Sequence, residues 1–254
     1  RGEDPFPGEA GLAEKLAEQV PSGALRATTE YADAIPGADA VVLVVPLLVD
    51  EESWQPDFGW MDAATRSLAE HLTPGTLVSY ETTLPVGTTR TRWKPLIEEV
   101  SGLTEGEDFH LVFSPERVLT GRVYADLKKY PKLVGGLNEA GARKAIEFYE
   151  SVLTFDARDD LPRPNGVWDM GTAEAAEMAK PAETTYRDVN IGLANHFRAF
   201  AAQVGIDAYS VTDACHSQPS SHLHRPGIAV GAHCIPVYPP PSPPAHPPPS
   251  PLPR

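Results

Sequence analysis

Apolar residues recur along the first part of the chain in short runs that are separated by longer amphipathic stretches. Four of these runs have the length and the β-branched composition of buried strands, and they cover residues 40–48, 75–85, 109–118 and 132–136. Apolar positions at helical spacing predict helices between and after them, over about 58–72, 87–99 and 138–152. Strands that alternate with helices predict βαβ units and an open parallel sheet. The pattern therefore predicts an α/β fold.

A longer helical stretch, residues 171–204, follows the predicted sheet and is rich in Ala, Glu, Met and Leu. Pro181 lies inside it, where a proline removes a backbone hydrogen bond and kinks a helix at a cost of about 3 kcal/mol. Four polar residues fall near one stripe of this helix, at spacings of four, three and three: Lys180, Thr184, Arg187 and Asn190. The stripe is either a solvated face or part of a site, and the spacing alone leaves both interpretations open.

Composition and charge narrow the classes of partner. The formal net charge of the 254 residues is -14, which argues against a nucleic-acid partner because phosphate binding requires clustered Lys and Arg. No apolar run reaches the roughly 18 residues of a membrane-spanning helix. The 2 cysteines are too few for a disulfide framework, so we expect a reducing, cytoplasmic compartment. Because the first residue is not Met, we expect the chain to begin partway through a longer protein.

Polar residues gather where two of the predicted strands end. The stretches 82–85 (TTLP) and 114–117 (SPER) lie at these ends, and ligands of open parallel sheets bind beyond the carboxyl ends of the strands. Glu116 and Thr83 could there position a water molecule, with the carboxylate as general base. The alternative for Glu116 is a loop carboxylate that caps a helix.

Cys234 lies in a loop of glycines, prolines and small residues, 224–239. Such a loop lets backbone approach a ligand closely, so the thiol is a candidate nucleophile, although free cysteines are often simply buried. A metal site built from Cys234 and the nearby His222, His224 and His233 would lack any standard zinc spacing. Lys180 is either an exposed helix lysine or, beside Cys234, a stabiliser of negative charge on a substrate oxygen.

Five segments in order resemble the UDP-glucose/GDP-mannose dehydrogenase family: VVLVVP, ETTLPVGTT, FSPERVLTG, EAAEMAKPAETTYRDVNIGLAN and HRPGIAVGAHCIPVYP. The resemblance spans residues 40–239 and is greatest to the bacterial subgroup that oxidises UDP-N-acetylhexosamines, the UDP-N-acetylmannosamine dehydrogenase type. It implies a Rossmann-like sheet followed by the long central helix of a dimerisation domain. It also implies NAD as cofactor, a UDP-sugar as substrate and a homodimer formed through that helix.

The resemblance implies a role for each candidate residue. Cys234 would attack the aldehyde formed by a first oxidation of the sugar alcohol, and the resulting thiohemiacetal would be oxidised to a thioester and hydrolysed. Lys180 would stabilise the substrate oxygen, while Glu116 and Thr83 would hold and activate water. The residues implied beside the cofactor are Pro46, Thr83 and Glu116. Those implied beside the substrate are Arg117, Val118, Leu119, Lys180, Thr184, Arg225, Gly227 and Gly231.

The chain also departs from the family pattern. Thr184 stands where many members have Asn, Tyr238 where they have Asp, and Pro181 where a leucine is common. No glycine-rich GxGxxG turn follows a predicted strand. We therefore expect an incomplete NAD-binding domain over 1–165, a central helical domain with the cysteine loop over 166–238, and a proline-rich disordered tail over 239–254. The alternative function is a fragment that dimerises without catalysis.

Overall fold

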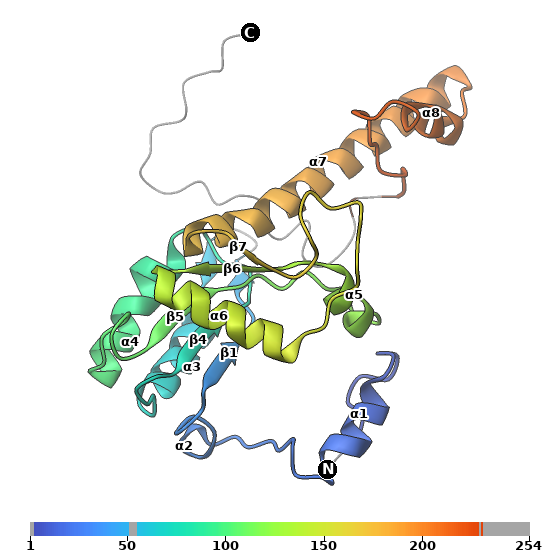
Figure 1. Ribbon diagram of the computed structural model, residues 1–254. Helices are drawn as coiled ribbons and strands as arrows, with labels where there is room; N and C mark the ends of the chain where they lie inside the picture. Colours follow the sequence, from blue (N-terminus) through green and yellow to red (C-terminus); the bar gives the residue numbers. More distant parts are fainter. Residues whose placement is uncertain (1–2, 51–54, 229, 231–254) are drawn as a thin grey trace. The chain divides into compact units, whose positions relative to one another are not determined.

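The protein is described by a computed structural model that covers residues 3–50, 55–228 and 230. The chain divides into two compact units, of which the first contains residues 1–48 and 57–180 and the second contains residues 49–56 and 181–254. The first unit holds a sheet with helices on both faces, and the second holds most of a long helix and one shorter helix (Figure 1).

The main sheet has five strands in the order β1-β4-β5-β6-β7. The strands are β1 (Ala40–Leu43), β4 (Leu77–Tyr80), β5 (His110–Phe113), β6 (Lys132–Gly136) and β7 (Val167–Asp169). The first three are parallel neighbours, with Leu43 opposite Tyr80 and Tyr80 opposite Phe113, so their carboxyl ends lie at one edge. The expected α/β fold with a mostly parallel sheet is confirmed. β1, β4 and β5 are shorter than the predicted runs, whereas β6 covers 132–136 as predicted.

One direction in the predicted sheet is wrong. β6 runs antiparallel to β5, with Val112 opposite Gly136 and Phe113 opposite Gly135, and it is parallel only to β7. A parallel connection requires a crossover that packs across a face of the sheet. The segment between β5 and β6 instead contains only the short helix α5 (Val123–Lys129). Because the apolar pattern of a buried strand is the same in either direction, it could not reveal this reversal.

The predicted helices are all present with small shifts at their ends. They are α3 (Gly59–Ala69), α4 (Lys94–Ser101) after a π-helical turn η1 (Thr89–Trp93), α6 (Glu139–Val152) and α7 (Ala173–Val204). α7 continues through Pro181 as one helix. Besides α5 and β7, the short elements that the pattern did not predict are α1 (Leu12–Gln19), α2 (Tyr31–Ala34), α8 (Ala208–Cys215) and the two-stranded sheet of β2 (Leu48–Val49) and β3 (Pro56–Asp57).

The core is divided by the sheet into two clusters. Successive side chains of a strand point to opposite faces, and in β4 Val78 and Tyr80 pack in one cluster while Leu77 packs in the other. The larger cluster includes the residues of α3 and α4, with Trp93 stacked on Tyr80. The smaller cluster lies under α6 and includes Tyr149. Burial on both faces explains why the sequence of β4 is apolar without alternation.

Two glycines of β6 are required by close backbone approaches. A Cβ atom on Gly135 would lie 2.0 Å from the carbonyl oxygen of Thr172, and one on Gly136 would lie 2.5 Å from that of Asn138. Only glycine can therefore occupy these positions without displacing the start of α7 or of α6. The GG pair thus allows the first turns of α7 to lie directly against the sheet.

Candidate functional site

The loops that follow β1, β4 and β5 are joined to one another at the carboxyl edge of the sheet. The Glu81 N–H donates to the carbonyl of Leu43 at 3.0 Å, and the Glu116 N–H donates to that of Glu81 at 3.1 Å. The Thr82 hydroxyl donates to the carbonyl of Val45 at 2.7 Å. Hydrogen bonds between neighbouring loops hold their backbones in a fixed relation, so side chains from all three loops are presented together.

Lys180 reaches this edge from α7. Its Nζ donates a hydrogen bond to the backbone carbonyl of Glu116 at 2.6 Å. Two of the residues singled out in the sequence, which lie far apart along the chain, are therefore in direct contact within the first unit. Of the two alternatives left open for Lys180, the structure does not fit a fully exposed helix lysine, because Lys180 is partly buried.

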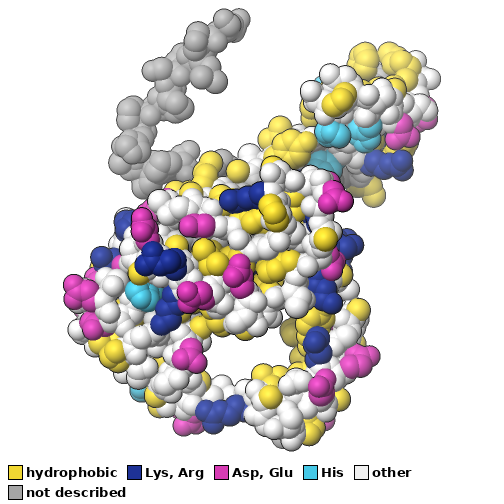
Figure 2. Space-filling model, in the orientation of Figure 1, with side chains coloured by type: hydrophobic (Ala, Val, Ile, Leu, Met, Phe, Trp, Pro, Cys, Tyr) yellow, Lys and Arg dark blue, Asp and Glu magenta, His cyan; other side chains and the backbone are white. Residues whose placement is uncertain are grey.

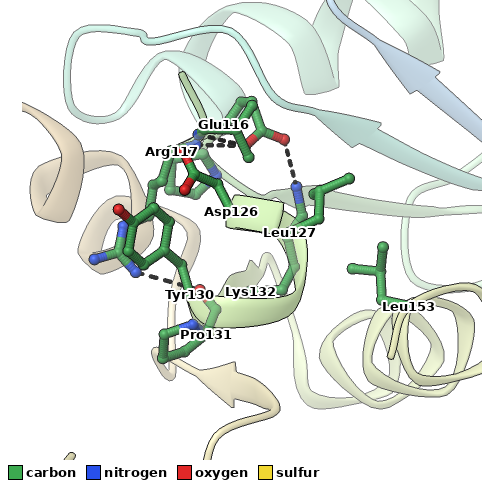
Figure 3. Close-up of a pocket in the computed structure, with 10 residues that line it drawn as sticks. Glu116, Arg117, Asp126, Leu127, Tyr130, Pro131, Lys132 and Leu153 are labelled. Atoms are coloured by element: carbon green, nitrogen blue, oxygen red, sulfur yellow. Dashed lines mark hydrogen bonds and ion pairs between the residues drawn. The ribbon is translucent and has the colours of Figure 1, made fainter. Parts of the chain in front are cut away.

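The Glu116 carboxylate has two different environments, one for each oxygen. Oε1 accepts the backbone N–H groups of Arg117 at 2.5 Å and of Val118 at 2.9 Å. Oε2 faces the ammonium group of Lys132 at 3.4 Å (Figure 3). The side chain is 36% exposed, so a small molecule can reach it. The helix cap that was the alternative for Glu116 is not formed, because the next helix begins only at Val123. One oxygen instead binds loop backbone, while the other lies beside a cation.

A buried polar network that the sequence analysis missed lies behind Glu116. Lys132 Nζ is 2.9 Å from Glu81 Oε1, and these side chains are 6% and 9% exposed. The Tyr149 hydroxyl donates to the same Glu81 oxygen at 2.6 Å and is 2.7 Å from the Ser79 hydroxyl. Burial and the neighbouring Glu81 carboxylate raise the pKa of the Tyr149 phenol, which keeps it a hydrogen-bond donor. The signal for this network in the sequence was slight: Glu81 follows the apolar part of the run 75–85, and Lys132 begins the run 132–136.

The reversed direction of β6 explains how Lys132 reaches this network. Lys132 is the first residue of β6. The antiparallel pairing sets the last residues of β6, Gly135 and Gly136, opposite the end of β5, so the beginning of β6 extends past β5 beside the loop that carries Glu116. The hydrogen bond from the Ser114 hydroxyl to the carbonyl of Leu133, 2.7 Å long, fixes the same relation. In a parallel arrangement Lys132 would lie at the opposite edge of the sheet.

The residues expected beside a dinucleotide lie on the same edge. Pro46 is exposed and follows β1, and Thr83 is half-buried and follows β4. The Thr83 hydroxyl makes no hydrogen bond to any residue that the structure describes. Nearby in β1 and just after it, Val42 and Val44 are 38% and 64% exposed. An available hydroxyl beside exposed apolar side chains fits the mixed polar and aromatic surface of a dinucleotide.

The loop that carries Thr83 is fastened to α7 a few residues later. Glu177, which is fully buried, accepts the N–H of Thr89 at 2.9 Å, its hydroxyl at 2.6 Å, and the N–H of Gly87 at 2.5 Å. One turn earlier, Glu174 forms a bidentate ion pair with Arg90, with a shortest distance of 2.6 Å. α7 therefore holds the Thr83 loop through two carboxylates and contacts Glu116 through Lys180.

A small cavity lies beside Glu116 and is too small for a sugar nucleotide. Its volume is about 10 Å³, which is what one ordered water molecule requires. Figure 3 shows the side chains around it, which come from the Glu116 loop, from α5 and the residues after it, from the start of β6, and from Leu153 at the end of α6. Arg117 spans its outer side, donating to the carbonyl of Pro131 at 3.2 Å and lying 5.9 Å from the centre of the Tyr130 ring. Val118 is half-buried beside it, and Leu119 is 49% exposed.

Three of the residues that were predicted to lie beside the substrate belong to the second unit. Thr184 is buried, and its hydroxyl donates to the carbonyl of Pro181 at 3.1 Å. Arg225 is exposed and lies 3.5 Å from Asp213. The N–H of Gly227 donates to Asn195 Oδ1 at 2.7 Å. The structure thus places Thr184 inside a helix and the other two in the loop that returns along it.

Asn190 extends the connection between α7 and this returning loop. Its side-chain amide donates to the carbonyl of His222 at 2.7 Å, and its oxygen accepts the N–H of His224 at 2.8 Å. A paired bond of this kind fixes both the position and the direction of the loop backbone. The polar stripe predicted on α7 is therefore not merely a solvated face at Asn190.

Two predicted residues, Cys234 and Gly231, lie outside the described residues, as do His233 and Tyr238. Among the residues that the structure does describe, no three His, Cys, Asp or Glu side chains are grouped closely enough to hold a metal ion. The same part of the chain has no helix that is long and apolar enough to cross a membrane.

The sheet, with ligand-competent loops gathered at the carboxyl ends of its parallel strands, is that of a Rossmann-like dinucleotide-binding protein. Residues 3–153 match the model of the NAD binding domain of the UDP-glucose/GDP-mannose dehydrogenase family, and residues 174–240 match the model of its central domain. The chain belongs to the UDP-glucose/GDP-mannose dehydrogenase family. The domain that it shares over its first 150 or so residues is the family's NAD-binding domain, which supports NAD as the cofactor.

Curated relatives carry the names of UDP-N-acetylhexosamine enzymes. The chain is 35% identical over 233 residues to UDP-N-acetyl-D-mannosamine dehydrogenase of Pyrococcus horikoshii, covering 91% of this chain and 52% of the relative. It is 32% identical over 237 residues to the enzyme of that name from Escherichia coli K12, covering 91% of this chain and 53% of the relative. The chain therefore spans about half the length of the curated relatives it matches.

Solved structures give the same picture. The Pyrococcus horikoshii UDP-D-ManNAc dehydrogenase superposes with a TM-score of 0.80 at 33% identity, over 90% of this chain and 51% of that one. An NDP-N-acetyl-D-galactosaminuronic acid dehydrogenase from Methanosarcina mazei superposes with a TM-score of 0.78 at 34% identity, over 92% of this chain and 48% of that one. The two neighbours differ in the sugar that their names give.

Proposed function

We propose that the protein acts in the NAD-dependent, four-electron oxidation of the primary alcohol of a UDP-sugar, a UDP-N-acetylhexosamine, to the uronic acid. The contact between Lys180 and the Glu116 carbonyl is the observation that carries this proposal. It brings together two candidate residues of the reaction from distant segments of the chain. The names of the relatives support an N-acetylmannosamine derivative as the sugar.

In this proposal each side chain has a defined task. The Cys234 thiolate attacks the aldehyde carbon, forming a C–S bond, while Lys180 stabilises the negative charge on the oxygen. After oxidation to the thioester, Glu116 accepts a proton from water as the water oxygen bonds to the carbonyl carbon. The C–S bond then breaks, the thiolate is released and the acid is formed. NAD, when bound, accepts one hydride in each of the two oxidations.

The residues of this chain that we assign to NAD are Pro46, Thr83 and Glu116. Thr83 supplies a hydroxyl that the described residues leave without a partner, and Pro46 supplies exposed apolar surface beside it. Because these side chains come from the ends of neighbouring parallel strands, a dinucleotide bound there lies across the carboxyl edge of the sheet. We propose the same domain division as the sequence indicated, with an NAD-binding part over 1–165, a central part over 166–238 and a proline-rich tail over 239–254.

The test is NADH formation by the chain with NAD and UDP-N-acetylmannosamine, followed by absorbance, with product analysed by mass spectrometry. We expect two NADH for each sugar acid and no turnover to acid in Cys234→Ala. The matched control is Cys215→Ala, which removes the other cysteine, at the end of α8. Turnover that survives Cys234→Ala would contradict the thioester route. No NADH with any UDP-hexosamine, from a folded wild-type chain that binds NAD in a direct binding measurement, would contradict the proposed function itself.

We also propose that the chain forms a homodimer through α7. Six large apolar side chains recur along α7 at spacings of three and four, each 42% to 63% exposed: Tyr186, Val189, Leu193, Phe197, Phe200 and Val204. Figure 2 shows hydrophobic side chains on the part of α7 that leads to α8. An exposed apolar stripe of this length on one helix face favours pairing with an equivalent face. The same pairing is the basis of the alternative function, a module that dimerises without catalysis.

Light scattering coupled to size-exclusion chromatography tests the homodimer. We expect Phe197→Glu to halve the mass of the particle, because it places a carboxylate in the stripe. Ala202→Glu adds the same charge to the opposite face of α7 and is expected to leave the mass unchanged. A wild-type chain with the mass of a monomer would exclude the homodimer. If that monomer also formed NADH, the alternative function, a module that dimerises without catalysis, would be excluded as well.

A further inference from the structure

A single buried ammonium group lies between two carboxylates that belong to two different loops of the site. Lys132 Nζ is 2.9 Å from Glu81 Oε1 and 3.4 Å from Glu116 Oε2. Glu81 begins the segment that carries Thr83, and Glu116 is the carboxylate that the proposed function assigns to the activation of water. Lys132 therefore joins the two places from which water would be held.

We propose that Lys132 is a positioning residue, which sets the Glu116 carboxylate against the Thr83 loop by sharing its charge between Glu81 and Glu116. The inference rests on the proposed function for the task of Glu116. Lys132 is not itself assigned to the substrate, because its side chain is 6% exposed and enclosed by the sheet edge.

The two ion pairs of Lys132 differ: the one with Glu81 is held in place by further contacts, whereas the one with Glu116 can adjust. Glu81 is held by the Tyr149 hydroxyl at 2.6 Å as well as by Lys132, and both partners are buried. The Tyr149 ring also lies under Lys132 Nζ, with 4.9 Å between the nitrogen and the ring centre. Glu116 is more exposed and its distance to the ammonium is longer. Lys132 is therefore a fixed cation against which the Glu116 carboxylate is oriented.

The orientation has a consequence for the Glu116 carboxylate. Oε1 is occupied by the N–H groups of Arg117 and Val118, so Oε2 is the oxygen that has capacity for a proton from water. A cation 3.4 Å from Oε2 fixes where that oxygen points. Glu81 binds the same ammonium at the shorter distance, so Lys132 orients Oε2 without being held by Glu116 alone.

A purely structural role would be different, since Lys132 could serve only to neutralise the buried Glu81. Lys132→Met alone cannot distinguish the two roles, because it strands the Glu81 carboxylate in the interior. The double variant Glu81→Gln with Lys132→Met removes both charges and relieves that penalty. It restores folding stability under either role, but it restores catalysis only if neutralisation is the whole function of Lys132.

We would measure kcat and KM for NADH formation together with the urea midpoint of unfolding in the full chain. For the double variant we expect a wild-type-like midpoint, a kcat about 10- to 100-fold below wild type, as for a misplaced catalytic group, and a KM within about 3-fold. Lys132→Arg, which keeps the charge, is expected to recover part of the rate. Lys129→Met, at an exposed lysine of α5, is the control. If the double variant recovered kcat along with stability, the inference would be wrong.

A second readout does not depend on turnover. The amide protons of Arg117 and Val118 donate to Glu116, so their NMR shifts report the position of that carboxylate. We expect both resonances to move in the double variant and in Lys132→Met, and to stay in place in Lys129→Met. Unmoved resonances in the two Lys132 variants would overturn the inference even in an active enzyme. A wild-type chain that forms no NADH would contradict the proposed function instead.

Discussion

Lys180 donates its 2.6 Å hydrogen bond to the backbone carbonyl of Glu116 and not to its carboxylate. A carbonyl has a fixed position in the loop, whereas a carboxylate can rotate. The bond therefore orients the lysine while the acid keeps its own set of partners: two backbone N–H groups and Lys132. Cation and carboxylate can then act on different atoms of a substrate without neutralising each other.

The first prediction concerns this lysine. Lys180→Met removes the ammonium that is proposed to face the substrate oxygen, so we expect kcat to fall by about 100- to 1,000-fold, the usual effect of losing one oxyanion donor. Lys180→Arg keeps a charge but changes its geometry and should recover little. NADH formation measures both, with the exposed Lys128→Met as the control. Equal rates in wild type and Lys180→Met would exclude this role.

The second prediction concerns two buried tyrosines. Burial is the largest cause that raises the pKa of Tyr80 and of Tyr149. Because both remain neutral in the folded chain at a pH where the unfolded chain ionises, near 10, the stability they contribute is present below that pH and is lost as the pH rises above it. We expect two of the 8 tyrosines to gain tyrosinate absorbance only as the chain unfolds in alkali.

Single substitutions assign that delayed signal. Tyr149→Phe should remove about half of it, whereas Tyr186→Phe, at a tyrosine that is 56% exposed, should reduce the early phase. If all tyrosines ionised together while circular dichroism still showed a folded chain, the result would contradict the burial of Tyr149 in its hydrogen-bond network.

The third prediction compares two glycines. Gly135→Ala forces a methyl group toward the Thr172 carbonyl, at 2.0 Å before any adjustment, so the start of α7 must shift. We expect a loss of at least about 1–3 kcal/mol of unfolding free energy, as for overpacking. Gly192→Ala places the same methyl group in α7 where nothing lies within 4 Å, and it should stabilise the helix by up to about 1 kcal/mol. Urea unfolding measures both, and equal effects would contradict the close approach.

The fourth prediction contrasts two glutamates of α7. Burial raises the pKa of Glu177, whereas the hydrogen bond from Arg90 lowers that of Glu174. The contribution of Glu177 is therefore full below its unfolded value of about 4.5 and is lost as the pH rises through its folded value. That of Glu174 is present above 4.5 and is lost as the pH falls. We expect Glu177→Gln and Glu174→Gln to change the pH dependence of unfolding free energy in opposite directions.

Urea unfolding from mildly acid to neutral pH provides the measurement. In Glu177→Gln the decline in stability above pH 4.5 should be reduced, and in Glu174→Gln the decline on acidification should be reduced. The Glu174 effect is the smaller, because that carboxylate is partly exposed and screened by water. Slopes that change in the same direction for both variants would contradict this assignment.

The sequence was sufficient to predict the strands and helices that bury large apolar surfaces. The run 109–118 stood out because both faces of the sheet are covered at β5, so its apolar residues are continuous. The run 40–48 is equally apolar, although Val42 and Val44 are exposed. Helix α7 was predicted close to its observed limits, despite Pro181, because its apolar periodicity persists over many turns. Short elements such as α5 and β7 were missed, since a few residues carry too little periodicity to be distinguished from loops.

The candidate site could be predicted only in part. Thr83, Glu116 and Lys180 were recognisable because polar residues follow apolar strands or lie near a helical stripe. Glu81 and Lys132 were not, because each belongs to the edge of an apolar run and its partner comes from a distant segment. No local spacing encodes such a pair. It depends on the direction of β6, which the apolar pattern does not specify.

Because of this reversed strand, the site combines residues on loops with one residue, Lys132, on a strand of the sheet. The loops after parallel strands are where related α/β enzymes vary in length and in specificity. Lys132 belongs to none of them, because its backbone is paired within the sheet, with its N–H bonded to the carbonyl of Gly166 at 3.0 Å. The position of this cation is therefore set by the sheet. If the surrounding loops were replaced to change specificity, the Lys132 ammonium would stay where it is.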